Sequence, residues 1–377
     1  MASMEYDLLI RAGRVFCVET GLDGPGSVAI AGDRIVASGP DVSGSAGETL
    51  DFPDGLALPG LVDMHAHPAP GDWKYGIDPD VHILPRGSTT ILSQGDSGAA
   101  EWPEYRRGII DGSRTRVRSA ISPALHGDST QAPPYADLSD MDVDACVAAI
   151  EDGDDIWGVS VNVSVVCCGD TDPKEVMRRT LAVAEATARP ILFGIRRDPF
   201  DWPLADQLEL LRPGDVLTYC FNGQKPSMVE GGRVVEAAWE ARKRGVLFDV
   251  GHGMMSMDFG VAEAAIADGF LPDTISTDIY KRHVGLSPTH DLPRTISKFM
   301  ASGMPENAAF ERVTAAPARV LGLEGEVGTL ATGACADVAV LRWNEDAAPL
   351  VDSSGQTRPG GCWEPALTVR GGEIIGG

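Results

Sequence analysis

Two histidines separated by a single residue are the clearest chemical signal in the sequence. His65 and His67 follow the run Leu58-Pro-Gly-Leu-Val-Asp-Met, and residues two apart on a β-strand share one face. Imidazole is the commonest metal ligand, and zinc accepts it beside a carboxylate. The pair therefore predicts a metal site at the end of a strand. The same spacing also fits two ordinary hydrogen-bonded histidines, so the surrounding pattern has to decide.

The strand with these histidines begins a long alternation of β-rich and helical segments. Strands are predicted at 89–92, 116–121, 156–166, 190–195, 215–221, 246–250 and 274–277, and helices at 102–111, 143–151, 173–188, 232–244, 258–268 and 291–301. With the first strand this makes eight, mostly with helices between them. The pattern predicts a TIM-like (β/α)₈ barrel over residues 58–322, whose active site would lie at the carboxyl ends of the strands.

Both ends of the chain are predicted to be β-rich instead. Short strands broken by Gly, Asp and Pro are predicted at 6–11, 14–18, 27–31 and 34–38, and the tail adds strands within 328–341 and 366–375. We therefore expect residues 1–57 and 323–377 to form one small β-sandwich domain that flanks the barrel.

Composition limits the partners and the compartment. The chain has 377 residues, with 55 Asp and Glu against 31 Lys and Arg, a net charge of -24. Such acidity argues against a nucleic-acid or membrane surface. It says little about the substrate, which we expect to be a small molecule. Seven cysteines do not suggest a disulfide framework, and no signal or membrane-spanning segment is evident. We expect a reduced cytoplasmic protein, with a homodimer as the default assembly.

The sequence resembles the amidohydrolase superfamily, the urease and dihydroorotase type, because Pro59-Gly-Leu-Val-Asp-Met-His-Ala-His67 begins the barrel inside a split β-sandwich. Further segments resemble one branch of that superfamily, the dihydroorotase-like deacetylases that remove acyl groups from amino or hydroxy acids. These segments are 215–223, 244–253, 272–278, 291–298 and 314–318. The likeness covers nearly the whole chain, but a fold alone does not carry chemistry.

The resemblance implies a site for two metal ions. Its ligands would be two His from strand 1, a carboxylated Lys from strand 4, one His each from strands 5 and 6, and an Asp from strand 8. His65 and His67 match the first pair, and Asp278 matches the last. The resemblance also assigns Asp278 the role of base; the simpler reading is a helix-capping or turn carboxylate after Ser-Thr.

The other three ligand positions depart from the branch. They hold Ser160, Gly194 and Tyr219. Serine cannot form the bridging carbamate, glycine has no side chain, and a phenol that titrates near about 10 is a poor zinc ligand. We expect the second metal to be lost, which leaves three ligands and an open position on one Zn²⁺ per chain, the arrangement of a catalytic zinc. A protein without any metal is the alternative.

Two further residues are predicted to do chemistry. His252, in Val250-Gly-His-Gly253, would lie at the top of strand 7 as a fourth ligand or proton shuttle, or as an ordinary histidine in a Gly-rich turn. Tyr219 would donate its phenol to a substrate oxygen, or merely fill the vacated volume.

Loop residues supply the predicted substrate contacts. Tyr75 would form an aromatic wall, Lys281 would pair with a substrate carboxylate, and Ser160 and Asn162 would contact substrate at the end of strand 4. Cys167 and Cys168 are either soft zinc ligands or small buried hydrophobic residues. The remaining residues expected on the catalytic rim are Trp73, Lys74, Asp78, His126, Arg282 and His283.

Three functions compete at this point. The first is a hydrolase that uses one metal to cleave an amide, ester or cyclic acyl bond of a small molecule. The second is a lyase, cyclase, isomerase or metal-free hydrolase with Asp278, His252 and Tyr219 as acid-base groups. The third is a binding or regulatory protein on a former enzyme scaffold. The retained His-His-Asp set favours the first.

Overall fold

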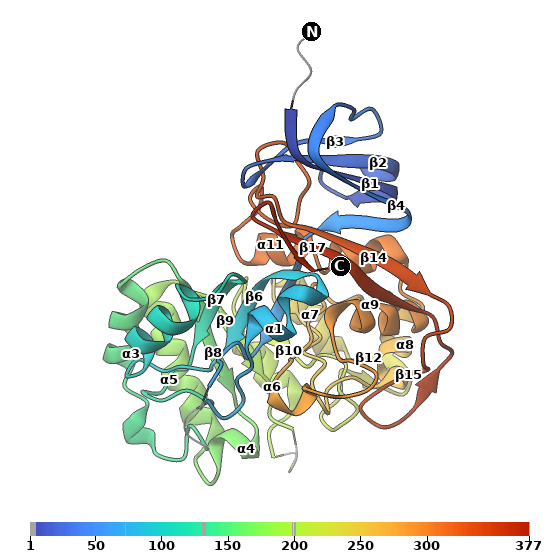
Figure 1. The fold of residues 1–377 in the computed structure, drawn as a ribbon. Helices are drawn as coiled ribbons and strands as arrows, with labels where there is room; N and C mark the ends of the chain where they lie inside the picture. Colours follow the sequence, from blue (N-terminus) through green and yellow to red (C-terminus); the bar gives the residue numbers. More distant parts are fainter. Residues whose placement is uncertain (1–4, 72, 130–132, 198, 200, 377) are drawn as a thin grey trace.

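The computed structural model describes residues 5–71, 73–129, 133–197, 199 and 201–376. Figure 1 shows a barrel of strands surrounded by helices, with a separate sheet above it that both ends of the chain build. No helix in these ranges is long and apolar enough to cross a membrane. The predicted fold class, a TIM-like barrel with a flanking β domain, is confirmed.

Seven parallel strands form the barrel sheet, in the order β13-β10-β9-β8-β7-β6-β5. All residues of β5 and β6 are buried, as expected for parallel strands covered on both faces. The strands are β5 (Leu61–Ala66), β6 (Ser88–Gln94), β7 (Arg116–Ile121), β8 (Ile156–Asn162), β9 (Ile191–Gly194), β10 (Val216–Thr218) and β13 (Leu247–Phe248).

The eighth predicted strand, 274–277, is not a regular strand, and this prediction was wrong in detail. The segment closes the barrel through two isolated parallel bridges, Asp249 to Thr274 and Ala66 to Ile279. Its backbone leaves strand geometry at Asp278, which has a left-handed φ of 48°. The segment therefore occupies the place of strand 8 and ends in a turn that presents a carboxylate.

The five longest helices lie where helices were predicted: α3 (Val143–Glu151), α5 (Pro173–Thr187), α7 (Glu236–Lys243), α8 (Phe259–Ala267) and α9 (Leu292–Ala301). Four of them begin at an aspartate whose side chain accepts a backbone N–H, namely Asp142, Asp172, Asp258 and Asp291. These caps satisfy amide groups that otherwise lack partners and fix where each helix starts.

Shorter helical turns fill the remaining connections. They are α1 (Pro79–His82), α2 (Trp102–Tyr105), α4 (Val165–Cys168), α6 (Leu204–Glu209), α10 (Glu306–Glu311), α11 (Ala315–Val320), the 3₁₀ turns η1 (Leu84–Arg86), η3 (Leu138–Asp140) and η4 (Lys281–His283), and the π-helical turn η2 (Arg106–Ile110). The strand predicted over 156–166 ends early, at Asn162. The Asn162 side chain accepts the Ser164 N–H at 3.1 Å, which turns the chain, and α4 begins at Val165.

The flanking domain, which we expected to be a small β-sandwich, is built from both chain ends as one continuous sheet in the order β18-β17-β14-β4-β1-β2-β3. Its strands are β1 (Glu5–Cys17), β2 (Leu22–Ala31), β3 (Arg34–Gly39), β4 (Ser45–Pro59), β14 (Val338–Asn344), β17 (Cys362–Arg370) and β18 (Glu373–Gly376). Two hairpins lie outside it, β11 (Val229–Glu230) with β12 (Arg233–Val234) and β15 (Leu350–Val351) with β16 (Thr357–Arg358). The antiparallel pairing of β4 with β14 joins the two ends of the chain. The domain limits at residues 57 and 323 stay a prediction.

Gly60 connects this sheet to the strand with the histidines. It lies between the last residue of β4 and the first residue of β5. A Cβ at this position would lie 2.2 Å from Thr89 Oγ1 and 2.9 Å from Asp337 Cβ. Only glycine fits there, so the flanking sheet holds the start of β5 firmly against the barrel.

Candidate metal centre and active-site cavity

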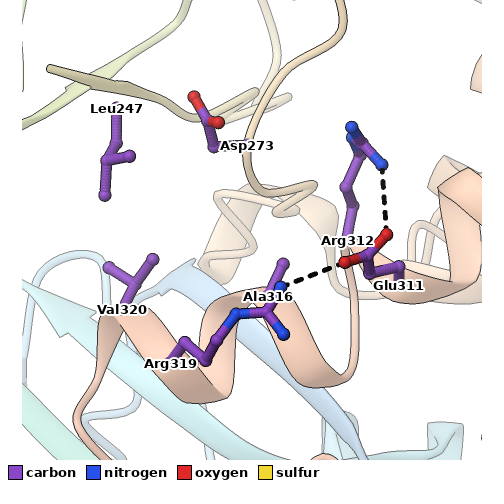
Figure 2. A pocket seen from close by; sticks show the side chains of 7 residues that line it. All are labelled: Leu247, Asp273, Glu311, Arg312, Ala316, Arg319 and Val320. Atoms are coloured by element: carbon purple, nitrogen blue, oxygen red, sulfur yellow. Dashed lines mark hydrogen bonds and ion pairs between the residues drawn. The ribbon is translucent and has the colours of Figure 1, made fainter. Parts of the chain in front are cut away.

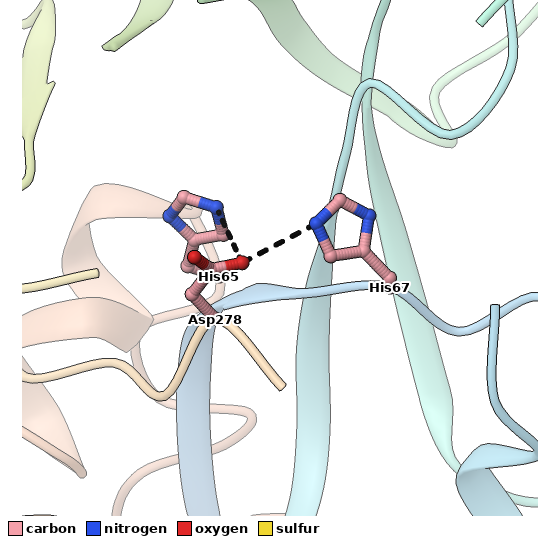
Figure 3. A group of neighbouring side chains, drawn as sticks. All are labelled: His65, His67 and Asp278. Carbon is pink, nitrogen blue, oxygen red and sulfur yellow. Dashed lines mark ion pairs between the residues drawn. The ribbon is translucent and has the colours of Figure 1, made fainter. Parts of the chain in front are cut away.

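His65, His67 and Asp278 meet at the carboxyl end of β5 (Figure 3). One oxygen of Asp278, Oδ1, lies 3.4 Å from Nε2 of His65 and 3.3 Å from Nε2 of His67. Two ligand atoms on a tetrahedral zinc, each about 2.0–2.1 Å from the ion, are about 3.3 Å apart. The three side chains therefore fit a single metal ion.

Asp96 fixes the outer nitrogen of His67. Nδ1 lies 2.8 Å from Asp96 Oδ1, and the hydroxyls of Ser93 and Ser129 donate to the same carboxylate at 2.7 and 2.6 Å. Burial alone would lower the pKa of His67, but the charges of Asp96 and Asp278 outweigh it and raise that pKa well above its usual value. The surroundings of His67 thus favour positive charge, either a proton or a metal ion.

A hydrogen-bond chain sets the tautomer of His65. The Thr218 hydroxyl donates to Asp249 Oδ2 at 2.9 Å, so its oxygen accepts from Nδ1 of His65 at 3.0 Å. Two further hydroxyls donate to the same aspartate at 2.6 Å. Nδ1 therefore carries the proton, and Nε2 presents a lone pair toward Asp278. Partners of this kind on the outer nitrogen are typical of metal-binding histidines.

Two glycines make room for the cluster. A Cβ on Gly253 would lie 2.3 Å from Asp278 Oδ2, and one on Gly251 would lie 2.2 Å from Thr218 Oγ1. Both glycines have left-handed φ values, 47° and 52°. The Gly-His-Gly turn is thus required by the packing of the Asp278 carboxylate and of the hydroxyl behind His65.

The three positions where this chain lacks the expected metal ligands make other contacts. Ser160 is buried, and its hydroxyl accepts from Gln94 Nε2 at 2.8 Å. A Cβ on Gly194 would lie 3.0 Å from both Tyr219 Cε2 and Asn162 Cγ. Little space is left at position 194 for a larger side chain.

Tyr219 lies directly beside the His-His-Asp cluster. Its hydroxyl is 3.5 Å from Nε2 of His65, and the Arg197 guanidinium lies 4.7 Å from the ring centroid. Burial and the nearby Asp278 carboxylate raise the pKa of the phenol well above its usual value. The phenol therefore stays protonated and can act as a hydrogen-bond donor.

A cavity of about 240 Å³ opens over the cluster. His67, Asp278 and Tyr219 border it together with Tyr75 and Asn162. The ring centroids of Tyr75 and Tyr280 lie 5.8 Å apart, and each lies 5.9 Å from the His67 ring. Tyr75, from the loop after His67, thus lies on the cavity wall where an aromatic residue was predicted, and Tyr280 from another loop lies beside it. Ser160 does not border the cavity directly but supports Gln94, which does.

Lys281, a predicted substrate contact, does not border the cavity. It is exposed, and its backbone N–H donates to the Tyr75 carbonyl at 2.9 Å. Its neighbour Arg282, expected on the catalytic rim, borders the cavity. The 3₁₀ turn η4 (Lys281–His283) decides which of the two cations faces the site.

His252 does not join the cluster as a fourth ligand, and its contacts fit the other expectation, an ordinary hydrogen-bonded histidine in a Gly-rich turn. Its Nδ1 lies 2.7 Å from the Gly253 carbonyl and its Nε2 2.7 Å from Lys298 Nζ, so both ring nitrogens are engaged elsewhere. Burial, with the Lys298 charge, lowers the pKa of His252 well below its usual value. It is a neutral histidine on the wall of a second hollow.

Of the other residues expected near the catalytic rim, some border the cavity and some do not. Cys167 borders the cavity, and burial raises the pKa of its thiol and that of Cys168, the latter to about 12. Both are buried, and neither belongs to the candidate ligand cluster, which fits the small hydrophobic role. His126 pairs with Glu101 at 2.9 Å, and Asp78 caps α1. The Trp73 ring contacts Tyr105, the Lys74 ammonium lies over the Tyr75 ring, and the His283 ring contacts Tyr280.

Asp128 is the residue that sequence reasoning missed. It borders the cavity, it is buried, and its Oδ1 has no hydrogen-bond partner among the described residues. Burial raises its pKa to about 7, although His67 acts in the opposite direction. A Cβ on Gly95 would touch both Asp128 and Ser160, so this carboxyl lies near the position of the lost lysine. The sequence offered one indication of its position, because Asp128 follows His126, a predicted rim residue, by two residues.

Another hollow, of about 320 Å³, lies at the opposite end of the barrel (Figure 2). Leu247, the first residue of β13, borders it. Glu311 pairs there with Arg319 at 3.0 Å and with Arg312 at 4.0 Å. Asp273, which also lines the hollow, pairs with Arg242 at 3.1 Å. The hollow lies at the amino ends of the strands, where barrel active sites do not lie.

Comparison with known proteins identifies the family, although no family model matches the chain. A deacetylase of Enterococcus faecalis is 32% identical over 377 residues, which cover 98% of this chain and 99% of that protein. The chain belongs to the dihydroorotase-like deacetylase branch of the amidohydrolase superfamily. A deacetylase of Agrobacterium fabrum is also 32% identical, over 92% of this chain and 86% of its own.

Solved structures agree with this assignment to the amidohydrolases. A crystal structure of an adenine deaminase matches with a TM-score of 0.88 and 31% identity, over 98% of this chain and 99% of that one. A dihydroorotase structure matches with a TM-score of 0.87 and 30% identity, over 98% and 97%. The predicted family and enzyme class are therefore confirmed: this amidohydrolase is a metal-dependent hydrolase of C–N bonds.

Proposed function

We propose that the protein uses one metal ion, Zn²⁺, to cleave the acyl bond of a small molecule, and that it is a deacetylase of an acylated amino or hydroxy acid. The observation that carries this proposal is the shared contact of Asp278 Oδ1 with Nε2 of both His65 and His67. The deacetylase names of the similar proteins support the substrate class.

The number of metal ions follows from the departing positions. Ser160 provides no bridging carboxylate, and Tyr219 and Asn162 fill the space beside Gly194. The described residues also contain a single cluster of three ligand groups. These contacts support one ion where the resemblance implied two.

The residues around the cluster have complementary tasks. A bound Zn²⁺ would polarise the acyl carbonyl and acidify a water molecule. Asp278 would accept the proton of the attacking water and return it to the leaving group. Tyr219 would donate a hydrogen bond to the oxygen on which negative charge develops. Arg282 would pair with a substrate carboxylate at the cavity rim.

The metal-independent alternative is not proposed, because it relied on His252 as one of three acid-base groups. His252 is engaged by Lys298 and the Gly253 carbonyl, outside the cavity of the cluster. Asp278 and Tyr219 alone would have to perform both proton transfers.

The test is acetate release from a panel of N-acetyl amino acids and O-acetyl hydroxy acids. Activity should depend on the substrate carboxylate, and Arg282→Ala should raise KM for those substrates about tenfold or more, whereas Lys281→Ala should not. A protein that turns over no acylated substrate with metal supplied would contradict the proposal. Equal effects of the two variants would contradict the role of Arg282.

A further inference from the structure

A second hollow, of about 460 Å³, opens beside α9 and is separate from the metal cluster. Its wall is rich in basic side chains, His252, His283, His290, Arg294 and Lys298. Each of the five is at most 9% exposed. Burying several cationic and proton-accepting groups close together is costly unless opposite charges or hydrogen bonds compensate them.

Two of these groups are cations without a carboxylate partner. Lys298 Nζ contacts Nε2 of His252 at 2.7 Å, and Arg294 donates to the carbonyls of Ala348 and Pro349, both at 2.9 Å. In the described ranges neither forms an ion pair. Burial lowers the pKa of Lys298 to about 8, so at pH 7 the ammonium is still charged. Lys298 and Arg294 therefore bring two positive charges to the hollow, against one carboxylate on its wall, Asp352.

The nearby carboxylates are already engaged. Asp291 accepts the Arg294 N–H at 2.9 Å as the cap of α9, and it pairs with Arg86 at 3.2 Å. Asp352 accepts the backbone N–H of Phe259 at 2.9 Å and that of Ser354 at 2.9 Å. Their negative charges favour the ammonium form of Lys298, but neither carboxylate can move into contact with Lys298 or Arg294 without breaking these bonds.

His283 adds a buried donor. Its Nδ1 accepts the Tyr280 N–H at 3.2 Å, so Nε2 carries the proton. Among the residues that the structure describes, that nitrogen makes no hydrogen bond of normal geometry, although the Gly253 backbone acts on the ring. The ring stacks on His290 at 4.1 Å, which holds it on the wall of the hollow.

We propose that this hollow binds an oxyanion, the phosphate or carboxylate group of a small molecule. Lys298 and Arg294 supply the charge, and Nε2–H of His283 supplies a directed hydrogen bond. In a chain of net charge -24, such a site selects anions that most of the surface repels.

The site is next to the active-site cavity but distinct from it. Met254 borders both hollows. His65 and His67 do not border the second one, and the Gly253 backbone stands between it and Asp278. An anion held by Lys298 would thus need no metal, so the proposal does not rest on the proposed deacetylase activity.

The first experiment measures Tm of the full-length protein at pH 7 as sodium phosphate, and separately sodium acetate, replaces sodium chloride at constant ionic strength. Thr289 is exposed and borders the hollow, so Thr289→Glu should weaken phosphate binding without affecting the core. Thr289→Gln is the matched neutral control. We expect a saturable rise in Tm, with about tenfold weaker apparent affinity in Thr289→Glu and in Lys298→Met.

The two titrations separate the two ligand groups: saturation by phosphate alone assigns a phosphate site, and saturation by acetate as well assigns a general oxyanion site. Comparing Thr289→Glu with Thr289→Gln tests whether the hollow binds the anion even if Lys298→Met fails to fold. A response to neither anion would overturn the proposal, and so would equal binding by the two Thr289 variants. Loss of the response in His67→Ala would place the anion at the metal cluster, which also overturns it.

Discussion

Nδ1 of His67 lies 2.8 Å from the carboxylate of Asp96, a residue that is not one of the three candidate ligands and does not line the cavity. The contact fixes the ring so that Nε2 faces Asp278, and it favours positive charge at the site. Metal affinity in this protein should therefore depend on a residue that never touches the metal.

Asp96→Asn should weaken metal binding about 10–100-fold, because the neutral amide no longer stabilises the charge on the ring. Competition with a chromophoric chelator would measure the affinity. Asp215→Asn is the control, since Asp215 is equally buried but pairs with Arg212 at the start of β10. Unchanged affinity in Asp96→Asn would show that the contact is only structural.

Gly253→Ala should abolish most of the activity. The new Cβ would lie 2.3 Å from Asp278 Oδ2, and a displacement of about 1 Å in a catalytic group can cost about 100-fold in rate. Gly333→Ala is the matched control, because Gly333 also has a left-handed φ but nothing lies within 4 Å of its Cβ position. Both variants should lose about 1–3 kcal/mol of unfolding free energy from backbone strain. Full activity in Gly253→Ala would mean that Asp278 is not held where the structure places it.

Tyr219→Phe separates a chemical role from simple filling of space. If the phenol stabilises the developing oxyanion, kcat should fall by about 10²–10³-fold while metal content and Tm stay the same. Steady-state kinetics and a thermal scan of the same preparation would settle it. Unaltered kcat would leave Tyr219 as a residue that occupies the volume beside Gly194.

Asp128 should make stability depend on pH. Its pKa rises from 3.8 to about 7 on folding, so between these values the folded protein binds a proton that the unfolded chain has released. The free energy of unfolding therefore falls as pH rises from about 4 to 7 and levels off above that, by at most about 4 kcal/mol for this group.

Asp128→Asn removes this pH-dependent loss of unfolding free energy. In the absence of metal, the variant should therefore become more stable relative to wild type as pH rises. Chemical denaturation at pH 5 and pH 8 would show it. Asp170→Asn, which removes an exposed carboxylate, should leave the difference between the two pH values unchanged. A parallel pH dependence of Asp128→Asn and wild type would contradict the assignment.

The sequence predicted the ligands better than their surroundings. His65, His67 and Asp278 each lie within a contiguous motif, and the barrel topology brings the ends of parallel strands together. Asp96 and Asp128 could not be assigned, because their roles depend on strand register and on the path of loops that periodicity does not describe.

The same limit explains the errors in detail. Whether Lys281 or Arg282 faces the cavity depends on a 3₁₀ turn that both residues share. The engagement of His252 by Lys298 joins residues 46 positions apart. The early end of β8 depends on one side-chain contact at Asn162. Short-range pattern predicts none of these contacts.

The central claim is one metal ion held by His65, His67 and Asp278, and elemental analysis of the purified protein tests it most directly. The account predicts about one zinc per chain, lost in His65→Ala and in Asp278→Asn. It should be retained in His126→Ala, because His126 pairs with Glu101 away from the cluster. Two metal ions per chain, or one that survives in His65→Ala, would contradict the account.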